Sequence, residues 1–330
     1  VVRHTEFLKY NKMKKNKILF MAVLALAFTT VGCEEDPTLT PNPIYVDPGT
    51  GGNGGGTGGG GTGGGGNGGG GNTGFLASTD SSGRVAVLED FTGVRCGFCP
   101  DGHDVAKDVK QQLGDKFIVI AVHGGSYAQP SPGWMDFTTP FAQGLISQAQ
   151  VSGYPAGQVN RILATDLGAT PQQNGMAMGR GSWKSAAEAV VQMPAPVNVG
   201  AKATWNSDST EISIKVDVYY TNEETMTNHI NIAVLQSGIS SKQSGGNPQE
   251  GYIQNHVLRD LITGQWGSPI TDATTKGAEV SETFSYTLPA DYNGSGPDGG
   301  GPIVKSQIDI VVFVTRGNSD ILNAVEIDID

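Results

Sequence analysis

The sequence predicts an α/β domain followed by an all-β antiparallel domain, most simply a sandwich, behind a glycine-rich segment. Strand and helix patterns alternate over residues 75–194, period-two strands dominate residues 195–330, and 19 of the 26 residues from 49 to 74 are glycine. The glycine-rich segment can neither bury apolar surface nor fix a backbone, so we expect a flexible tether. The 256 residues that follow it suit two compact domains better than one.

Residues 1–32 are predicted to be an upstream extension and a signal peptide. Lysines precede an apolar run over residues 18–28, and a small residue stands just before Cys33. Eleven apolar residues fall short of the ~20 that a membrane-spanning helix needs. The segment resembles a bacterial lipoprotein signal, although Thr30 stands where leucine is usual. This resemblance implies that Cys33 is the first residue of the mature protein and carries lipid, palmitate included.

Residues 33–74 are predicted to form an acidic, glycine-rich linker between the lipid and the folded part. Glu34-Glu35-Asp36 resembles the acidic export signal of some surface lipoproteins, and it reads equally well as a solvated tether. We therefore expect an outer-membrane lipoprotein on the periplasmic or the cell-surface face. Loss of residues 1–32 removes six Lys/Arg and one acid, which changes the formal charge from −11 to −16. A chain this acidic is a poor candidate for nucleic-acid binding.

The elements of residues 75–194 follow the order strand, C-x-x-C, helix, strand, helix, strand, helix. Apolar spacing predicts strands at 85–88, 117–122 and 158–163, and helices at 104–113, 141–150 and 183–193. Residues 195–330 instead alternate apolar and polar side chains. Strands are predicted there at 212–218, 230–234, 281–288 and 308–315, which indicates an antiparallel all-β domain.

The motif Cys96-Gly97-Phe98-Cys99-Pro100 carries the clearest chemistry, because these cysteines are the pair left once Cys33 is assigned to lipid. We expect them to form a disulfide. At the start of a helix, unpaired N–H groups and the helix dipole favour the thiolate of Cys96. Cys96 would then attack a substrate disulfide, and Cys99, one turn on, would resolve the mixed disulfide. The pair predicts thiol–disulfide exchange without deciding whether the protein is an enzyme.

Four other residues are predicted to serve this site. Thioredoxin-like proteins place a cis-proline opposite the C-x-x-C, and Pro155 follows Tyr154 in the expected order, before an apolar strand. Phe98 and Tyr154 are expected to flank the site as apolar substrate contacts. Glu89, in preference to Asp90, is expected to take a proton from the resolving thiol.

Three segments resemble the twenty-eight-kilodalton outer-membrane-protein family of Bacteroidota lipoproteins. They are Leu88 to Pro100, with Thr-Gly-x-x-Cys-x-x-Cys-Pro, Gly153 to Arg161, with Gly-Tyr-Pro-x-Gly-x-x-Asn-Arg, and Asn255 to Asp260. The likeness covers roughly residues 84–330. It implies a thioredoxin-like domain over 75–194 fused to a β-sandwich over 195–330. The family is discussed as surface antigens or adhesins, so the resemblance implies a fold more firmly than an activity.

The same residues support other interpretations. In oxidising surroundings the Cys96–Cys99 disulfide serves equally as a structural clip. Soft thiolates near His103 or His123 suit copper(I), although we assign no metal and no cofactor. Asp291-x-Asn293-x-Ser295-Gly296 matches half of a calcium loop, but Pro302 occupies the position of its essential glutamate.

Two functions remain in competition. The first is disulfide exchange with an extracytoplasmic protein or peptide substrate by a lipid-anchored envelope protein. The second is a non-enzymatic surface binding module or adhesin that uses the β domain and the loop around Trp134, with a structural disulfide. A protein partner is expected in both cases.

Overall fold

The computed structural model describes residues 74–294 and 298–330 of the chain. The expectations for the signal peptide, for Cys33 and for most of the glycine-rich tether therefore lie outside the described residues. In the part that is described, no helix combines the length and the apolar character needed to cross a membrane.

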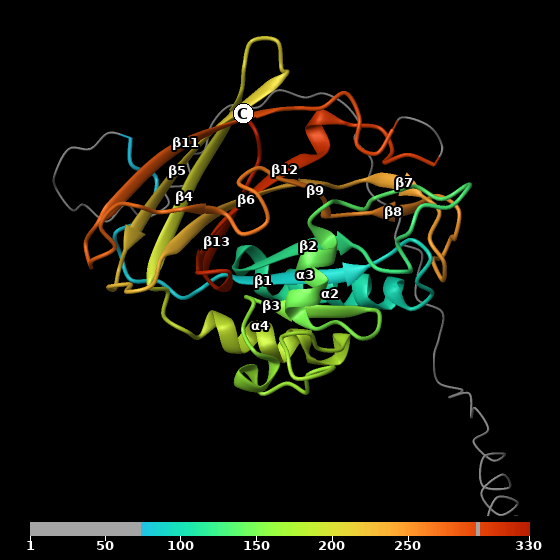
Figure 1. Ribbon diagram of the computed structural model, residues 1–330, viewed down its shortest axis with the longest axis horizontal. Coiled ribbons are helices and arrows are strands. Elements are labelled where there is room, and N and C mark those ends of the chain that lie inside the picture. The colour runs from blue at the N-terminus through green and yellow to red at the C-terminus, as the bar shows by residue number, and fades with distance from the viewer. Residues whose placement is uncertain (1–73, 295–297) are drawn as a thin grey trace, which may run out of the picture. The chain divides into compact units, whose positions relative to one another are not determined.

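An eight-stranded mixed sheet organises the described part (Figure 1). Its order is β13-β12-β6-β9-β2-β1-β3, and the short β10 also pairs with β6. The strands are β1 (Ala86–Thr92), β2 (Phe117–His123), β3 (Ala156–Val159), β6 (Asn228–Gln236), β9 (Val257–Leu261), β10 (Ser268–Pro269), β12 (Ile308–Arg316) and β13 (Ser319–Ile327). β1 runs parallel to β2 and antiparallel to β3.

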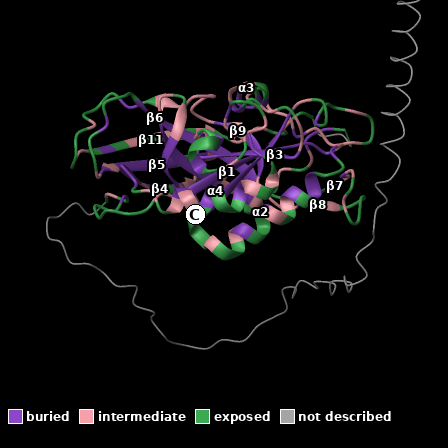
Figure 2. Ribbon diagram, turned by 90° about the horizontal axis from the view of Figure 1, so that it is seen from below, coloured by how far each residue is buried: buried purple, intermediate pink, exposed green. Residues whose placement is uncertain are grey.

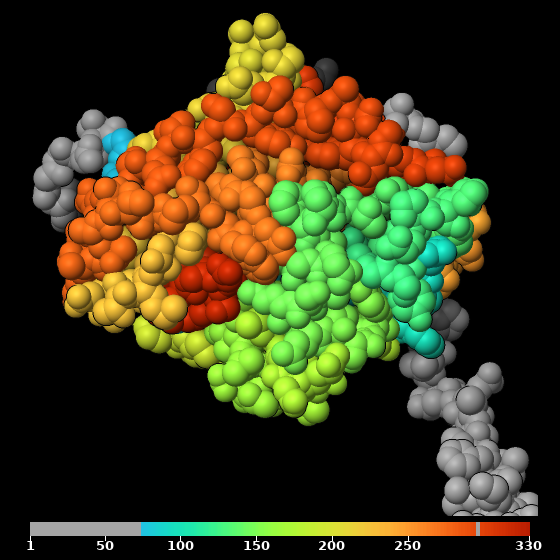
Figure 3. All heavy atoms as spheres, viewed as in Figure 1, coloured from blue at the N-terminus to red at the C-terminus, as the bar shows by residue number. Residues whose placement is uncertain are grey.

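Strands from both sides of residue 194, where the sequence predicts a domain boundary, belong to the same mixed sheet. β2 pairs with β9, and the amide of Ala121 donates a hydrogen bond of 2.8 Å to the carbonyl of His256. In the space-filling view, the green atoms of the first half and the orange and red atoms of the second form one continuous face (Figure 3). The two segments therefore share one sheet.

Three helices cover the sheet at the end formed by β1, β2 and β3. They are α2 (Cys99–Leu113), α3 (Ala142–Ala149) and α4 (Trp183–Val191). Leu88 of β1 packs with residues of α2 and α4, whereas Val87 and Phe91 on the opposite face of β1 pack with α3. The helices turn buried residues toward the sheet and exposed residues toward solvent (Figure 2). Four short 3₁₀ helices are η1 (Gly114–Lys116), η2 (Ala164–Leu167), η3 (Arg180–Ser182) and η4 (Lys305–Gln307).

A three-stranded antiparallel sheet covers the other end of the mixed sheet. It consists of β4 (Val197–Trp205), β5 (Glu211–Tyr220) and β11 (Glu279–Thr287), in the order β11-β5-β4. Ile212 and Ile214 of β5 share an apolar cluster with Ile232 of β6 and Ile310 of β12, so the two sheets pack face to face. Separately, β7 (Ile239–Ser241) and β8 (Tyr252–Gln254) form a two-stranded hairpin.

Among the elements that differ from their predicted bounds, β3 and α2 do so for visible physical reasons. β3 ends at Val159, short of the predicted 163, because Asn160 and Arg161 have φ values of 49° and 51°. Asn160 then accepts a hydrogen bond from the Val87 amide and donates to the carbonyl of Ile321. The helix predicted from 104 begins at Cys99, because Pro100 is tolerated in the first turn of a helix.

Candidate functional site

Cys96 and Cys99 are joined by a disulfide at the beginning of α2. Cys99 is the first residue of the helix, and Cys96 lies in the loop between β1 and α2. The loop is fixed by its own backbone, since the Cys96 amide donates to the carbonyl of Gly93 at 2.9 Å. The structure therefore places both sulfur atoms at a helix start, where the sequence predicts them.

The disulfide is covered although the residue beside it is exposed. Cys96 is 2% exposed and Cys99 is 0% exposed, whereas Phe98 between them is 68% exposed. The covering segment is the loop between β7 and β8, residues 242–251, which we call the strap. Its Ser244 amide donates a hydrogen bond of 2.8 Å to the carbonyl of Val94.

Gln243 holds the strap onto the cysteine loop. Its buried Nε2 donates to the carbonyls of Gly93 and Cys96, at 3.2 and 3.0 Å. Its Oε1 accepts a 2.9 Å hydrogen bond from Gln254 of β8. Gly245 lies against the backbone of Gly97, so closely that a side chain at Gly245 would collide with the Gly97 carbonyl. Side-chain and backbone contacts thus hold the strap against the loop that carries Cys96.

Pro155 lies directly before β3, and its peptide bond with Tyr154 is cis. The Pro155 ring packs closely against Gly102 of α2. The space between them is small, since a Cβ added to Gly102 would lie only 3.1 Å from the Pro155 Cβ. The Tyr154 ring is half-buried and lies edge-on to Tyr127, with 5.6 Å between ring centroids. Burial raises the pKa of Tyr154 to about 12. Tyr154 therefore packs with the loop after β2, while Phe98 is the exposed apolar side chain at the disulfide.

Glu89, the predicted proton acceptor, is engaged in a buried ion pair. Arg161 donates to both of its carboxylate oxygens, at 2.9 and 2.8 Å, and Gln158 donates to one of them at 2.7 Å. Successive strand residues face opposite sides of a sheet, so Glu89 shares the α3 side with Val87. That is the side of β1 away from α2, whereas the predicted role requires a carboxylate on the α2 side.

Asp90 is the carboxyl group on the α2 side of β1. It is 1% exposed, and its Oδ1 has no hydrogen-bond partner in the described part of the chain. Its Oδ2 lies 3.7 Å from Nε2 of His103, one helical turn after Cys99. Burial raises the pKa of Asp90 to about 8. Counting the two-residue period from Leu88 would have identified Asp90 from sequence.

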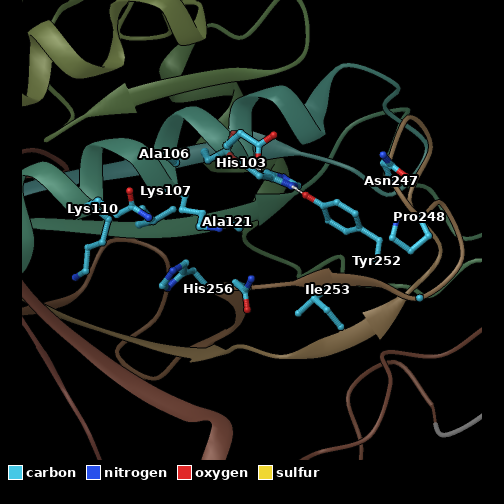
Figure 4. A pocket seen from close by; sticks show the side chains of 16 residues that line it. His103, Ala106, Lys107, Lys110, Ala121, Asn247, Pro248, Tyr252, Ile253 and His256 are labelled. Atoms are coloured by element: carbon cyan, nitrogen blue, oxygen red, sulfur yellow. Dashed lines mark hydrogen bonds and ion pairs between the residues drawn. The ribbon is translucent and has the colours of Figure 1, made fainter. Parts of the chain in front are cut away.

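His103 links α2 to the strap hairpin. Its Nε2 lies 3.0 Å from the Thr92 hydroxyl. Its Nδ1 lies 2.8 Å from the Tyr252 hydroxyl, and Figure 4 shows this contact. Burial, and secondarily His256, lower the pKa of His103 to about 4. A cavity of about 470 Å³ lies between α2 and this hairpin, and its lining includes Asp90, His103, Tyr252 and His256. Asp90 therefore borders a cavity rather than solid core.

The residues considered for metal binding have other contacts. The cysteines are bonded to each other, and His103 contacts Thr92 and Tyr252. His123 is buried edge-on to Phe137, and burial lowers its pKa to about 3. Over residues 74–294 and 298–330, no cluster of three His, Cys, Asp or Glu side chains is arranged to hold a metal.

In the segment that resembles half of a calcium loop, Asp291 and Asn293 form hydrogen bonds with the protein backbone. Asp291 Oδ1 accepts from the Gly294 amide, and Asn293 donates to the carbonyls of Asp136 and Thr138. Ser295 and Gly296 lie outside the described residues.

Three solved structures are similar to this chain to different degrees. HBP35 of Porphyromonas gingivalis has a TM-score of 0.57 and 18% identity, over 76% of each chain. An Agrobacterium tumefaciens protein has a TM-score of 0.45 and 11% identity, over 75% of this chain and 95% of that one. A domain of the outer membrane lipoprotein Omp28 from Porphyromonas gingivalis has a TM-score of 0.28 and 18% identity, over 41% of this chain and 99% of that one. At these identities HBP35 is informative for the fold alone.

No curated protein matches the chain. Residues 142–329, more than half of the sequence, match the family model described as outer membrane protein Omp28, and the chain therefore belongs to this family of outer-membrane proteins.

Proposed function

We propose that this protein is an outer-membrane lipoprotein, anchored through Cys33, that exchanges disulfides with an extracytoplasmic protein or peptide. Residues 75–194 would form a thioredoxin-like part, and residues 195–330 a sandwich-like part that covers or presents it. The topology supports this: parallel β1 and β2 are connected through α2, and antiparallel β3 is followed by α4. Membership in an outer-membrane family supports the location.

The observation that carries the proposal is the Cys96–Cys99 disulfide at the start of α2, together with Asp90 on the strand face that α2 covers, whose Oδ1 has no hydrogen-bond partner in the described part of the chain. In the reduced protein, the Cys96 thiolate attacks a substrate disulfide and releases one substrate thiol. The Cys99 thiolate then attacks Cys96 in the mixed disulfide, releases the second substrate thiol and restores the protein disulfide.

Asp90 would act as the base for the second step. A carboxyl group with a pKa of about 8 is poised to exchange a proton near neutral pH. It faces the side of the sheet that bears Cys99, and the adjoining cavity gives it a route to water. The role expected of Glu89 is therefore reassigned to Asp90 in this proposal.

An insulin-reduction assay tests the activity. Purified full-length protein, supplied with dithiothreitol, should precipitate insulin faster than the Cys96→Ser variant. The Cys99→Ser variant should instead accumulate a mixed disulfide, because the resolving thiol is missing. Equal rates for wild type and Cys96→Ser would rule out the exchange activity.

The 2% exposure of Cys96 favours a second candidate, a surface binding module in which the disulfide is a structural clip. Trp134 lies in the loop expected to contact a partner, and its ring centroid is 4.9 Å from the ammonium nitrogen of Lys242 in the strap. A reduction potential below about −300 mV would identify the bond as structural. A higher potential, together with insulin reduction, would support exchange.

A further inference from the structure

Arg259 on β9 is a buried cation that forms no ion pair with any residue that the structure describes. The residue is 5% exposed, and its Nε, Nη1 and Nη2 atoms have neither solvent contact nor a hydrogen-bond partner in the described structure. The guanidinium lies 4.3 Å from the ring centroid of Tyr292 and 5.7 Å from that of Phe137. Burial lowers the pKa of Arg259 to about 10. An unpaired buried charge is costly, so its retention requires an explanation.

The acidic side chains around Arg259 are occupied by other donors. Asp136 accepts from the amide and the hydroxyl of Thr138, at 2.9 and 2.6 Å. Asp260 accepts from Tyr286 at 3.0 Å, and Asp291 accepts from the Gly294 amide at 2.8 Å. None of the three forms an ion pair with Arg259 among the residues described.

A cavity of about 260 Å³ adjoins the guanidinium. Its lining includes Arg259, Thr139, Tyr292 and Asn293, together with two acidic residues, Asp260 and Asp291. The Thr139 hydroxyl is also buried without a partner in the described part of the chain. Two residues with unsatisfied donors, one in the loop after β2 and one in the strand β9, therefore line the same small cavity. Buried polar groups normally have partners, so the pair points to a missing acceptor.

We propose that this cavity binds a carboxylate, which pairs with the guanidinium of Arg259 and accepts a hydrogen bond from Thr139. The planar donor fork of arginine matches the two oxygens of a carboxylate. A single negative charge is favoured over a doubly charged phosphate, because Asp136, Asp260 and Asp291 lie nearby. The volume accommodates a small organic acid or the free end of a peptide chain.

The site gives a role to the Asn255 to Asp260 segment, which the disulfide chemistry leaves unused. Arg259 supplies the charge, and Asp260 holds Tyr286, whose hydroxyl lies 2.9 Å from that of Tyr292. Tyr292 in turn stacks with the guanidinium. The segment therefore builds both the donor and the aromatic support that orients it, independently of Cys96 and Cys99.

The test is the melting temperature of the full-length protein in detergent, with sodium acetate replacing sodium chloride at constant ionic strength. A ligand that binds the folded state raises the melting temperature. Acetate should raise it and sodium phosphate should raise it less. Trialanine and its C-terminal amide show whether the natural ligand is a peptide end or a small acid. If trialanine raises the melting temperature at a lower concentration than acetate does, and its amide does not raise it, the site binds a peptide terminus. If acetate and trialanine are equally potent, the site binds a small acid.

Two variants and one control assign the effect. Arg259→Met should weaken acetate binding about tenfold or more, and Thr139→Val about fivefold. Arg180→Met should change nothing, because Arg180 is exposed and pairs with exposed Asp101. In chloride, Arg259→Met should melt at or above the wild-type temperature, since it removes an uncompensated buried charge.

A wild-type melting temperature that ignores both acetate and trialanine would overturn the proposal, as would an undiminished acetate response in Arg259→Met. If Arg259→Met does not fold, the comparison between Thr139→Val and Arg180→Met decides. Equal acetate affinities in those two variants would then reject the site.

Discussion

Glu89 and Asp90 are neighbours in β1 with opposite electrostatic environments. Glu89 faces the α3 side and has a buried arginine and a glutamine as partners. Asp90 faces the α2 side, where its Oδ2 lies 3.7 Å from Nε2 of a histidine. Burial lowers the pKa of that histidine, His103, to about 4, so it remains neutral at neutral pH. An ionised Asp90 is therefore uncompensated, whereas an ionised Glu89 is paired.

Asp90 should make the protein less stable as the pH rises from 6.5 to 8. Its pKa is about 8 in the folded state against an ordinary value of 3.8, so between these values only the unfolded state has lost the proton. The free energy of unfolding then falls with pH by up to about 1.4 kcal/mol per unit. The loss is complete above pH 8. Urea unfolding at a series of pH values measures this slope.

The histidines oppose this trend only at lower pH. His103 and His123 have folded pKa values of about 4 and about 3 against 6.5, so they make stability rise with pH up to 6.5. Above pH 6.5 only the decrease in the free energy of unfolding that is due to Asp90 remains. Asp90→Asn should flatten it, while Asp104→Asn, an exposed change beside the same cavity, should preserve it. A wild-type curve already flat from pH 6.5 to 8 would contradict the assignment.

At the scale of single elements, the sequence predicts the three helices and the strands β1, β2, β5, β6, β11 and β12, but it misses the nine-residue strands β4 and β13. β2, β6 and β12 have continuous or alternating apolar residues, and the prolines and glycines around them mark their ends. β9 escapes prediction because Val257–Leu261 is short and contains Arg259 and Asp260 within its apolar run. Its identity as a strand depends on pairing with β2 and β6, which are distant in sequence.

The residues of the site also fall into a group that the local sequence predicts and a group that it does not. The C-x-x-C, its helix and Pro155 follow from local spacing and from the family resemblance. Gln243, Tyr252 and His256 do not, because each meets the first half of the chain only through tertiary contacts. Nothing in the local sequence of the strap indicates that it covers a disulfide more than a hundred residues earlier.

The strap should control how fast the disulfide is reduced. Gln243→Ala removes the hydrogen bonds to the carbonyls of Gly93 and Cys96, so the strap should open more often. Loss of about 1.4 kcal/mol of closing free energy corresponds to a roughly tenfold faster reduction by a small thiol. The measurement is the rate at which alkylatable thiols appear in dithiothreitol, read by mass spectrometry.

Glu250→Gln provides a matched change in the same loop, because the Glu250 side chain is exposed and contacts only Lys242 among the ion pairs of the described chain. Its reduction rate should equal that of the wild type. If Gln243→Ala also reacts at the wild-type rate, the strap does not limit access, and the burial of Cys96 must be relieved by another motion.

For the molecule as a whole, the main consequence is that both halves share one apolar core. Val87, Phe91 and Ile120 from the first half belong to the same cluster as Leu258 and Phe313 from the second. The sequence predicts two domains because the pattern of alternating strands and helices gives way to period-two strands near residue 194. It cannot reveal that the strands on either side complete a single sheet.

Residues 75–194 should therefore not fold by themselves. Removal of the second half would expose the surfaces that contact Leu235, Leu258 and Phe313, at about 1.5–3 kcal/mol for each large side chain. The sum is comparable with the whole stability of a typical domain, about 5–15 kcal/mol. Circular dichroism of this fragment should show no cooperative melting, whereas residues 75–330 should unfold in one transition. A fragment that melts cooperatively and keeps its disulfide chemistry would instead establish two independent domains, with the shared sheet formed after each half has folded.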